Sequence, residues 1–148
     1  MPDKKPSIQS VSEPENSNKT IKILLVEDDE LNIRMISSFL GSKYHIDEAK
    51  SGEEALKKVL DNNYDLFLMD IGLKKEMTGL DVTKKLRKMD AYRKTPIVAV
   101  TAYALAGDKE RILQAGCSHY LSKPFSKKDL VNKVRHWVSK CNSIVLQN

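Results

Sequence analysis

Short apolar segments and longer amphipathic segments alternate five times between about residue 21 and residue 140. Most of the apolar segments lack polar residues at alternate positions, which is typical of strands covered on both faces of a sheet. This pattern predicts strands at residues 21–26, 44–48, 64–69, 96–101 and 119–122.

The segments between these strands have the apolar spacing of helices with one buried face. In the first of them, Leu31, Met35 and Phe39 recur every fourth residue, beside Ile36 and Leu40 at the same spacing. The other segments show similar faces. We therefore predict helices at residues 28–40, 51–60, 79–89, 105–116 and 126–140.

Residues at the ends of several segments support these boundaries. Ser51 and Glu54 have the spacing of a capping box, in which each side chain accepts a hydrogen bond from the other residue's main chain. Gly116 is suited to end the fourth helix, and Ser126 with Asp129 is suited to start the last one.

Five strand–helix units with short connections predict an α/β fold, a doubly wound and mostly parallel sheet with helices on both faces. A chain of 148 residues that is 41% hydrophobic suits one domain. The first twenty residues are polar and contain three prolines. We expect a flexible leader at 1–20, a domain at 21–140 and a short tail at 141–148.

Polar residues follow four of the five predicted strands. Each has a structural explanation by itself, because acidic residues favour helix N-termini, a single Asp suits a turn, a Thr can cap a helix and a Lys can be a surface amine. Since the carboxyl ends of parallel strands form one edge where ligands bind, their combination favours a functional site. These residues are the sequence EDDE at 27–30, Asp70, Thr101 and Lys123.

The acidic residues of this edge predict a cation site. If the first strand lies beside the third, Asp70 faces the acidic cluster with no basic residue in either segment. Carboxylates at close range repel one another unless a cation joins them. Oxygen ligands without nearby His or Cys suit Mg²⁺, with Mn²⁺ as an alternative ion, better than zinc.

The net charge of +5 raises the question of nucleic acid as a partner. The segment 74–94 holds eight basic and three acidic residues, which accounts for the whole excess. Only Tyr92 interleaves with these charges, so a platform for stacking bases is poorly supported. We expect a solvated helix face here, and no nucleic acid partner.

The composition also bears on location. No segment approaches the roughly 18 consecutive apolar residues of a membrane span, and the N-terminus lacks a signal-peptide apolar core. Cys117 and Cys141 have no metal-ligand spacing. We expect a cytoplasmic protein with two free thiols and no membrane partner.

Four fragments in this order, ILLVEDDELN, DLFLMDIGL, IVAVTAYAL and YLSKPF, resemble the receiver domain of two-component response regulators. The resemblance covers residues 21–140. It implies a flavodoxin-like (βα)5 fold with strand order 2-1-3-4-5. It also implies a phosphoacceptor rather than an enzyme that turns over external substrates.

The resemblance assigns a role to each acidic residue of the predicted edge. Asp70 matches the aspartate that accepts a phosphoryl group from a phosphohistidine. Asp28 matches a direct ligand of Mg²⁺, and Glu27 a direct or water-mediated one. Asp70 and the main-chain carbonyl of Gly72 would complete the metal ligands.

The resemblance also implies a switch. Thr101 matches the hydroxyl that contacts the phosphoryl group, and Lys123 the lysine that pairs with it. Thr101 and Tyr120 match a coupled pair whose movement reshapes the surface of the fourth helix, fifth strand and fifth helix. The bond between Lys123 and Pro124 matches one that is usually cis.

The implied partners are a histidine kinase or histidine phosphotransfer protein and a downstream effector protein. With no output domain after the last helix, we expect a free-standing regulator, a phosphorelay intermediate or the receiver of a hybrid kinase. The three histidines lack a kinase-like context. They are His45, His119 and His136.

Two functions of other classes remain open at this level. A phosphatase with an aspartyl nucleophile usually has a second Asp two residues later, where this chain has Gly72. An interaction module of the same fold would not need phosphorylation, and the full set of acidic, hydroxyl and lysine residues argues against it.

The loop after Asp70 departs from the common family form, because Lys74 replaces a proline and LKKEMTG is one residue longer.

Overall fold

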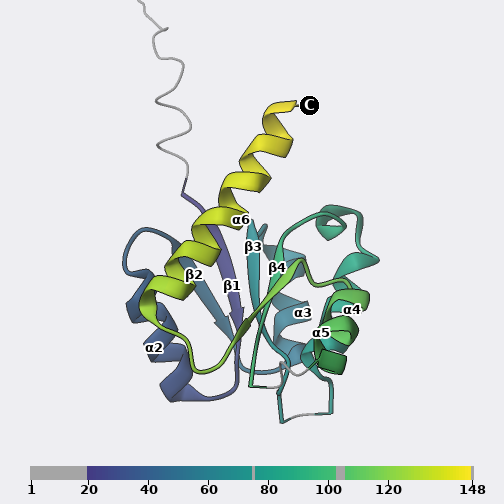
Figure 1. The fold of residues 1–148 in the computed structure, drawn as a ribbon. Helices are drawn as coiled ribbons and strands as arrows, with labels where there is room; N and C mark the ends of the chain where they lie inside the picture. The colour runs from purple at the N-terminus through teal and green to yellow at the C-terminus, as the bar shows by residue number, and fades with distance from the viewer. Residues whose placement is uncertain (1–19, 75, 103–105, 148) are drawn as a thin grey trace, which may run out of the picture.

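The computed structural model describes residues 20–74, 76–102 and 106–147, so all but the last residue of the expected leader lies outside it. Its five strands form one parallel sheet in the order β2-β1-β3-β4-β5, which confirms the predicted fold class (Figure 1). The strands are β1 (Lys22–Val26), β2 (His45–Ala49), β3 (Leu66–Asp70), β4 (Ile97–Thr101) and β5 (His119–Ser122).

Helices cover both faces of the sheet. The contacts place α2 and α6 against each other on one face, while α3, α4 and α5 pack on the other (Figure 1). No helix among the described residues combines the length and apolar character needed to cross a membrane. The helices are α2 (Glu30–Leu40), α3 (Gly52–Asp61), α4 (Gly79–Arg87), α5 (Ala106–Gln114) and α6 (Lys127–Gln147), with a 3-10 turn η2 (Asp90–Tyr92).

The unbroken apolar strands are explained by two separate cores. In β3, Leu66 and Leu68 pack into the core beneath α2 and α6, whereas Phe67 and Met69 pack into the core beneath α3, α4 and α5. Successive side chains of a strand point to opposite faces, so both sets must be apolar. Asp70, the last residue of β3, is the first polar residue after this run.

The first helix differs from its predicted form in two ways. Asp29 is its N-cap and accepts a hydrogen bond from the Leu31 main chain at 2.9 Å, so the helix begins at Glu30 rather than at residue 28. Leu31 is 73% exposed, so its assignment to the apolar face was wrong. Ile36 and Leu40 of the predicted face are buried, together with Ile33, because these positions face the sheet.

The predicted helix starts are largely present. Ser51 accepts a hydrogen bond from the Glu54 main chain at 3.1 Å, but the Glu54 carboxylate takes the N–H of Lys50, so the capping box is only half formed. At the start of α6, the Ser126 N–H donates to the Asp129 carboxylate and the Asp129 N–H donates to the Ser126 hydroxyl.

Several helix ends differ from the prediction, among them that of α5, which lies at Gln114 and not at residue 116. Helix α4 ends at Arg87 and not at residue 89, and the chain then turns through η2. The Arg87 side chain explains this path, because it donates to the carbonyls of Tyr92, Thr95 and Gly116 at 2.6–2.8 Å. Helix α6 continues past the expected domain end at residue 140, to Gln147.

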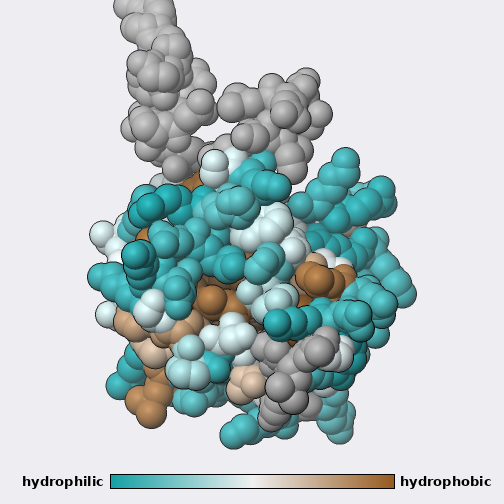
Figure 2. Space-filling view, in the orientation of Figure 1, coloured by the Kyte–Doolittle hydropathy of each residue, from teal (hydrophilic) through white to brown (hydrophobic). Residues whose placement is uncertain are grey.

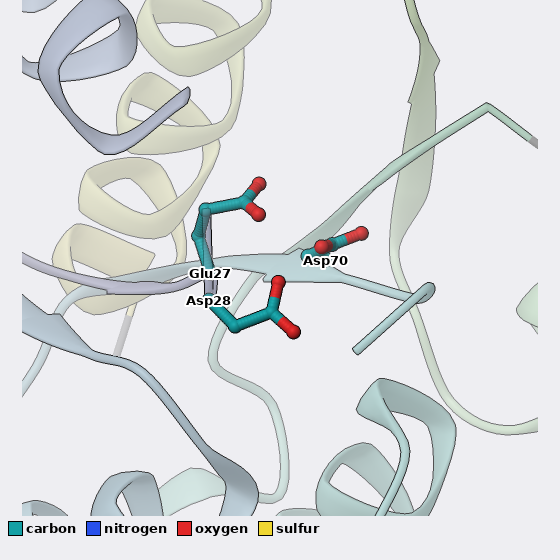
Figure 3. Close-up of side chains that lie close together, drawn as sticks. All are labelled: Glu27, Asp28 and Asp70. Carbon is teal, nitrogen blue, oxygen red and sulfur yellow. The ribbon is translucent and has the colours of Figure 1, made fainter. Parts of the chain in front are cut away.

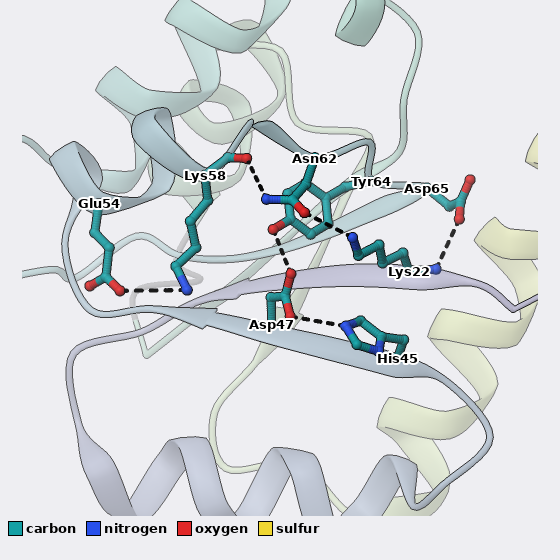
Figure 4. Close-up of polar contacts among 8 residues, drawn as sticks. All are labelled: Lys22, His45, Asp47, Glu54, Lys58, Asn62, Tyr64 and Asp65. Carbon is teal, nitrogen blue, oxygen red and sulfur yellow. Dashed lines mark hydrogen bonds and ion pairs between the residues drawn. The ribbon is translucent and has the colours of Figure 1, made fainter. Parts of the chain in front are cut away.

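A polar network joins the amino ends of the first three strands in the sheet (Figure 4). The Tyr64 hydroxyl donates to Asp47 at 2.7 Å, and the other Asp47 oxygen lies 3.1 Å from the His45 ring. Lys22 donates to Asn62 at 3.0 Å. These contacts hold the edge of the sheet opposite to the predicted site.

The face of the molecule seen in Figure 1 is mostly hydrophilic, with several smaller apolar areas between the polar ones (Figure 2). The large apolar side chains that are exposed among the described residues are Leu31, Leu60 and Leu113.

Candidate functional site

The parallel register aligns the carboxyl ends of the strands. Val26 pairs with Met69, Asp70 with Val100, and Thr101 with Ser122. Glu27 follows β1 directly and Lys123 follows β5 directly. The structure therefore brings the polar residues predicted from four separate strands to one edge of the sheet.

Three carboxylates meet at this edge (Figure 3). Glu27 and Asp28 extend from the end of β1 and Asp70 from the end of β3, and one oxygen of each lies within 4.8 Å of the others. Glu27 is 1% and Asp70 5% exposed, whereas Asp28 is half-buried. Three oxygen donors with one side open to solvent fit a hexacoordinate Mg²⁺ that keeps several water ligands.

Lys123 provides a cation to two of these carboxylates. Its Nζ lies 3.3 Å from Glu27 Oε1 and 3.7 Å from Asp70 Oδ1. The Lys123 side chain is 22% exposed, so the ion pair is formed at the boundary between the interior and solvent. Within the part of the chain that the structure describes, this one lysine pairs with a cluster of three carboxylates, which therefore keeps an excess of negative charge.

Burial and the charge excess together make Glu27 a weaker acid. Burial and the neighbouring Asp70 raise the pKa of Glu27 from 4.5 to about 7. Lys123 and the main-chain N–H of Asp29, which donates to Glu27 Oε2 at 3.2 Å, oppose this rise only in part. A further cation beside these carboxylates would lower the pKa again, which is the electrostatic property of a metal site.

The loop after β3 supplies main-chain donors to the cluster. The N–H of Gly72 donates to Asp70 Oδ1 at 2.9 Å, and the N–H of Lys74 donates to Asp28 Oδ2 at 2.9 Å. Ile71 and Leu73 are buried in the core next to them. The altered loop thus contacts the site through its backbone, a contact that the residue types alone do not indicate.

Gly79 is a residue of this site that the sequence analysis did not assign. A Cβ atom built on Gly79 would lie 2.2 Å from the main-chain oxygen of Asp70, so only glycine fits at this distance. The Thr78–Asp81 capping box fixes the start of α4 at the same point. The spacing Met77-x-Gly79 was the signal that could have identified it.

Thr101 and Lys123 lie at the ends of neighbouring strands. Thr101 is fully buried, and its carbonyl accepts the main-chain N–H of Lys123 at 2.8 Å. The bond between Lys123 and Pro124 is cis, as the family resemblance implies.

Tyr120 is half-buried and packs at the margin of the core beneath α3, α4 and α5. In the register of β4 and β5, Tyr120 pairs with Ala99, and Ala99 lies two positions before Thr101. His119 stacks on the Tyr120 ring, with centroids 5.1 Å apart, and the ammonium group of Lys109 lies 5.4 Å from the ring centre.

A parallel sheet of order 2-1-3-4-5 with acidic residues and a lysine at its carboxyl edge defines a receiver-type domain. Residues 23–135 match the family model of the response regulator receiver domain, and the chain belongs to this family.

Individual relatives agree with this family. The polar-differentiation response regulator DivK of Brucella ovis is 40% identical over 120 residues, which cover 80% of this chain and 97% of the relative. The receiver domain of a sensor histidine kinase from Pseudomonas aeruginosa is 36% identical, with a TM-score of 0.75, over 82% of this chain and 99% of that domain. In that structure a magnesium ion is coordinated in the active-site cleft. The chemotaxis protein CheY4 of Vibrio cholerae is 28% identical, with a TM-score of 0.76, over 80% of this chain and 99% of its own.

Proposed function

We propose that Asp70 accepts a phosphoryl group from a phosphohistidine of a histidine kinase or histidine phosphotransfer protein. The observation that carries the proposal is the position of the Asp70 carboxylate, which is buried at the end of β3 close to two further carboxylates and to the Lys123 ammonium group.

The reaction forms one bond and breaks another. A carboxylate oxygen of Asp70 attacks the phosphorus atom, so that a new O–P bond forms while the P–N bond of the phosphohistidine breaks. The electron pair of that bond passes to the imidazole nitrogen, which takes up a proton. The product is an acyl phosphate on Asp70, and the Gly72 N–H at 2.9 Å helps to hold the attacking carboxylate in place.

Glu27, Asp28, Asp70 and the main-chain carbonyl of Gly72 would hold Mg²⁺, with Mn²⁺ as an alternative. The separation of the carboxylate oxygens, the raised pKa of Glu27 and the magnesium ion in the Pseudomonas relative support this assignment. The bound ion supplies positive charge that stabilises the phosphoryl oxygens during transfer.

Lys123 and Thr101 would bind the phosphoryl group itself. In the structure, the Lys123 Nζ already lies 3.7 Å from Asp70 Oδ1, so a phosphoryl oxygen on Asp70 would lie within reach of the same ammonium group. Thr101 is at the end of the adjacent strand β4, which pairs with Asp70 through Val100. Fixed donors of this kind stabilise charge that develops during the transfer.

Phosphorylation would signal through a surface of the domain. A phosphoryl group adds negative charge at a buried site, and Thr101 with Tyr120 would convert this local change into a rearrangement at α5, β5 and α6. The half-buried position of Tyr120, between the core and the Lys109 ammonium group, supports its assignment as the moving ring. The protein would therefore act by binding an effector and not by turning over a substrate.

The test is phosphorylation of the full chain by a small acyl-phosphate donor in the presence of Mg²⁺, followed by intact mass. We expect one base-labile phosphoryl group on the wild type and none on Asp70→Asn. Asp61→Asn, at the exposed end of α3, is the matched control and should label like the wild type. Undiminished labelling of Asp70→Asn would overturn the proposal. A folded wild type that takes up no phosphoryl group would favour a phosphorylation-independent interaction module of the same fold.

A further inference from the structure

The loop after β3 reaches across to the end of β1, where a main-chain group of the loop forms a hydrogen bond. The N–H of Lys74 donates to Asp28 Oδ2 at 2.9 Å, across 46 positions of sequence. A hydrogen bond to an ionised carboxylate is stronger than one between neutral groups. This hydrogen bond therefore ties the loop to a candidate metal ligand.

The position of this N–H is fixed by the residues before it and not by the Lys74 side chain. Leu73 is 6% exposed and packs in the core beneath α3, α4 and α5, which anchors the loop immediately before Lys74. The Lys74 side chain is exposed. The main chain and the side chain of this residue can thus be separated by substitution.

We propose that the main-chain N–H of Lys74, a donor that the proline of the common family form would lack, is a positioning group for the Mg²⁺ site of this chain, because it fixes the orientation of the Asp28 carboxylate. The inference rests on the proposed function, since it assumes that Asp28 is a metal ligand. A carboxylate offers about four lone-pair sites, so a hydrogen bond at Oδ2 leaves Oδ1 free for an ion. Groups that orient metal ligands typically change metal affinity by 10- to 100-fold when they are removed.

The roles of the Lys74 main-chain N–H and of the Lys74 side chain are tested separately by a matched pair of variants in the full chain. Lys74→Pro removes the N–H together with the side-chain charge, whereas Lys74→Ala removes the charge and keeps the N–H. Affinity for magnesium chloride is measured by isothermal titration calorimetry, and thermal unfolding in a chelator verifies the fold. We expect Lys74→Pro to bind Mg²⁺ about tenfold or more weakly than the wild type, and Lys74→Ala to bind like the wild type.

The outcomes separate this inference from the proposed function. Equal affinity of Lys74→Pro and the wild type, or an equal loss in Lys74→Ala and Lys74→Pro, overturns the role of the N–H. A folded wild type that binds no Mg²⁺ overturns the proposed metal site, and this inference with it.

A second measurement avoids the proline substitution, which can disturb the loop. Amide hydrogen exchange at Lys74 is followed by NMR in metal-free wild type and in Asp28→Ala. We expect slow exchange in the wild type and faster exchange in Asp28→Ala, since the acceptor is gone. Equal exchange rates in the two proteins would show that Asp28 does not hold this N–H, and would overturn the proposal even where Lys74→Pro fails to fold.

Discussion

The ammonium group of Lys123 lies 3.3 Å from the Glu27 carboxylate, although 96 positions separate the two residues in the sequence. The contact joins the ends of β1 and β5, which do not pair with each other in the sheet. Asp70, at the end of β3, is within 3.7 Å of the same ammonium group. The charge balance of the site therefore depends on a side chain from the far edge of the sheet.

Replacing Lys123 with Met removes this cation without adding a hydrogen-bonding group. We expect phosphorylation of Asp70 by an acyl-phosphate donor to slow about 100-fold, as for other fixed donors that stabilise developing charge. The measurement is the rate of label uptake at saturating Mg²⁺. Lys127→Met, at the exposed start of α6, is the control. A rate for Lys123→Met equal to that of the control would contradict the role of Lys123.

The pKa of Glu27 predicts how stability changes with pH in the metal-free protein. The folded state raises this pKa from 4.5 to about 7, so Glu27 holds its proton more tightly when folded than when unfolded. Its contribution to the free energy of unfolding is fully present below about pH 4.5 and is lost as the pH rises through about 7. Wild-type stability in a chelator should therefore fall across this range, measured by urea unfolding.

Glu27→Gln provides the matched test of this pH dependence. Gln has similar size and no titratable group, so the fall in stability between pH 4.5 and 7 should be smaller in the variant. Adding Mg²⁺ to the wild type at pH 8 should restore stability, because an ion that binds only the folded state shifts the equilibrium toward it. Parallel stability curves for the two proteins would assign the pH dependence to other groups.

Gly79→Ala tests the close approach of α4 to the end of β3. The new Cβ would lie 2.2 Å from the Asp70 carbonyl oxygen, so the backbone must shift. We expect a loss of about 1–3 kcal/mol in the free energy of unfolding, typical of overpacking. Gly107→Ala, in α5 with no atom within 4 Å of its Cβ, should be neutral or gain up to about 1 kcal/mol. Equal effects at both positions would show that helix propensity alone is being measured.

Substitution of Arg87 should have a large effect on the free energy of unfolding. Its guanidinium satisfies the carbonyls of Tyr92, Thr95 and Gly116, and burial lowers its pKa. Arg87→Met should lower the free energy of unfolding by about 3 kcal/mol, because several half-buried carbonyls lose their partner. Lys84→Met, exposed on the same helix, should change it by less than about 0.5 kcal/mol. Similar urea midpoints for the two variants would contradict this assignment.

The sequence by itself determined the element types and the position of the phosphoacceptor candidate. Hydrophobic periodicity is a local property, so the continuous apolar run before Asp70 indicated a strand buried on both faces, and the four polar strand ends indicated one edge. The strand order came from the resemblance to receiver domains. Most helix starts could be read from capping residues, since their hydrogen bonds involve neighbours in the chain.

Only the tertiary structure decided which groups meet. The pairing of Lys123 with Glu27, the donation from the Lys74 backbone to Asp28 and the contact of Gly79 with Asp70 each join separate elements. Main-chain donors carry no signature in residue type, and exposure depends on which face of a helix meets the sheet, which is why Leu31 was misplaced. Such contacts arise when secondary structure packs, because distance in space is then no longer set by distance along the chain.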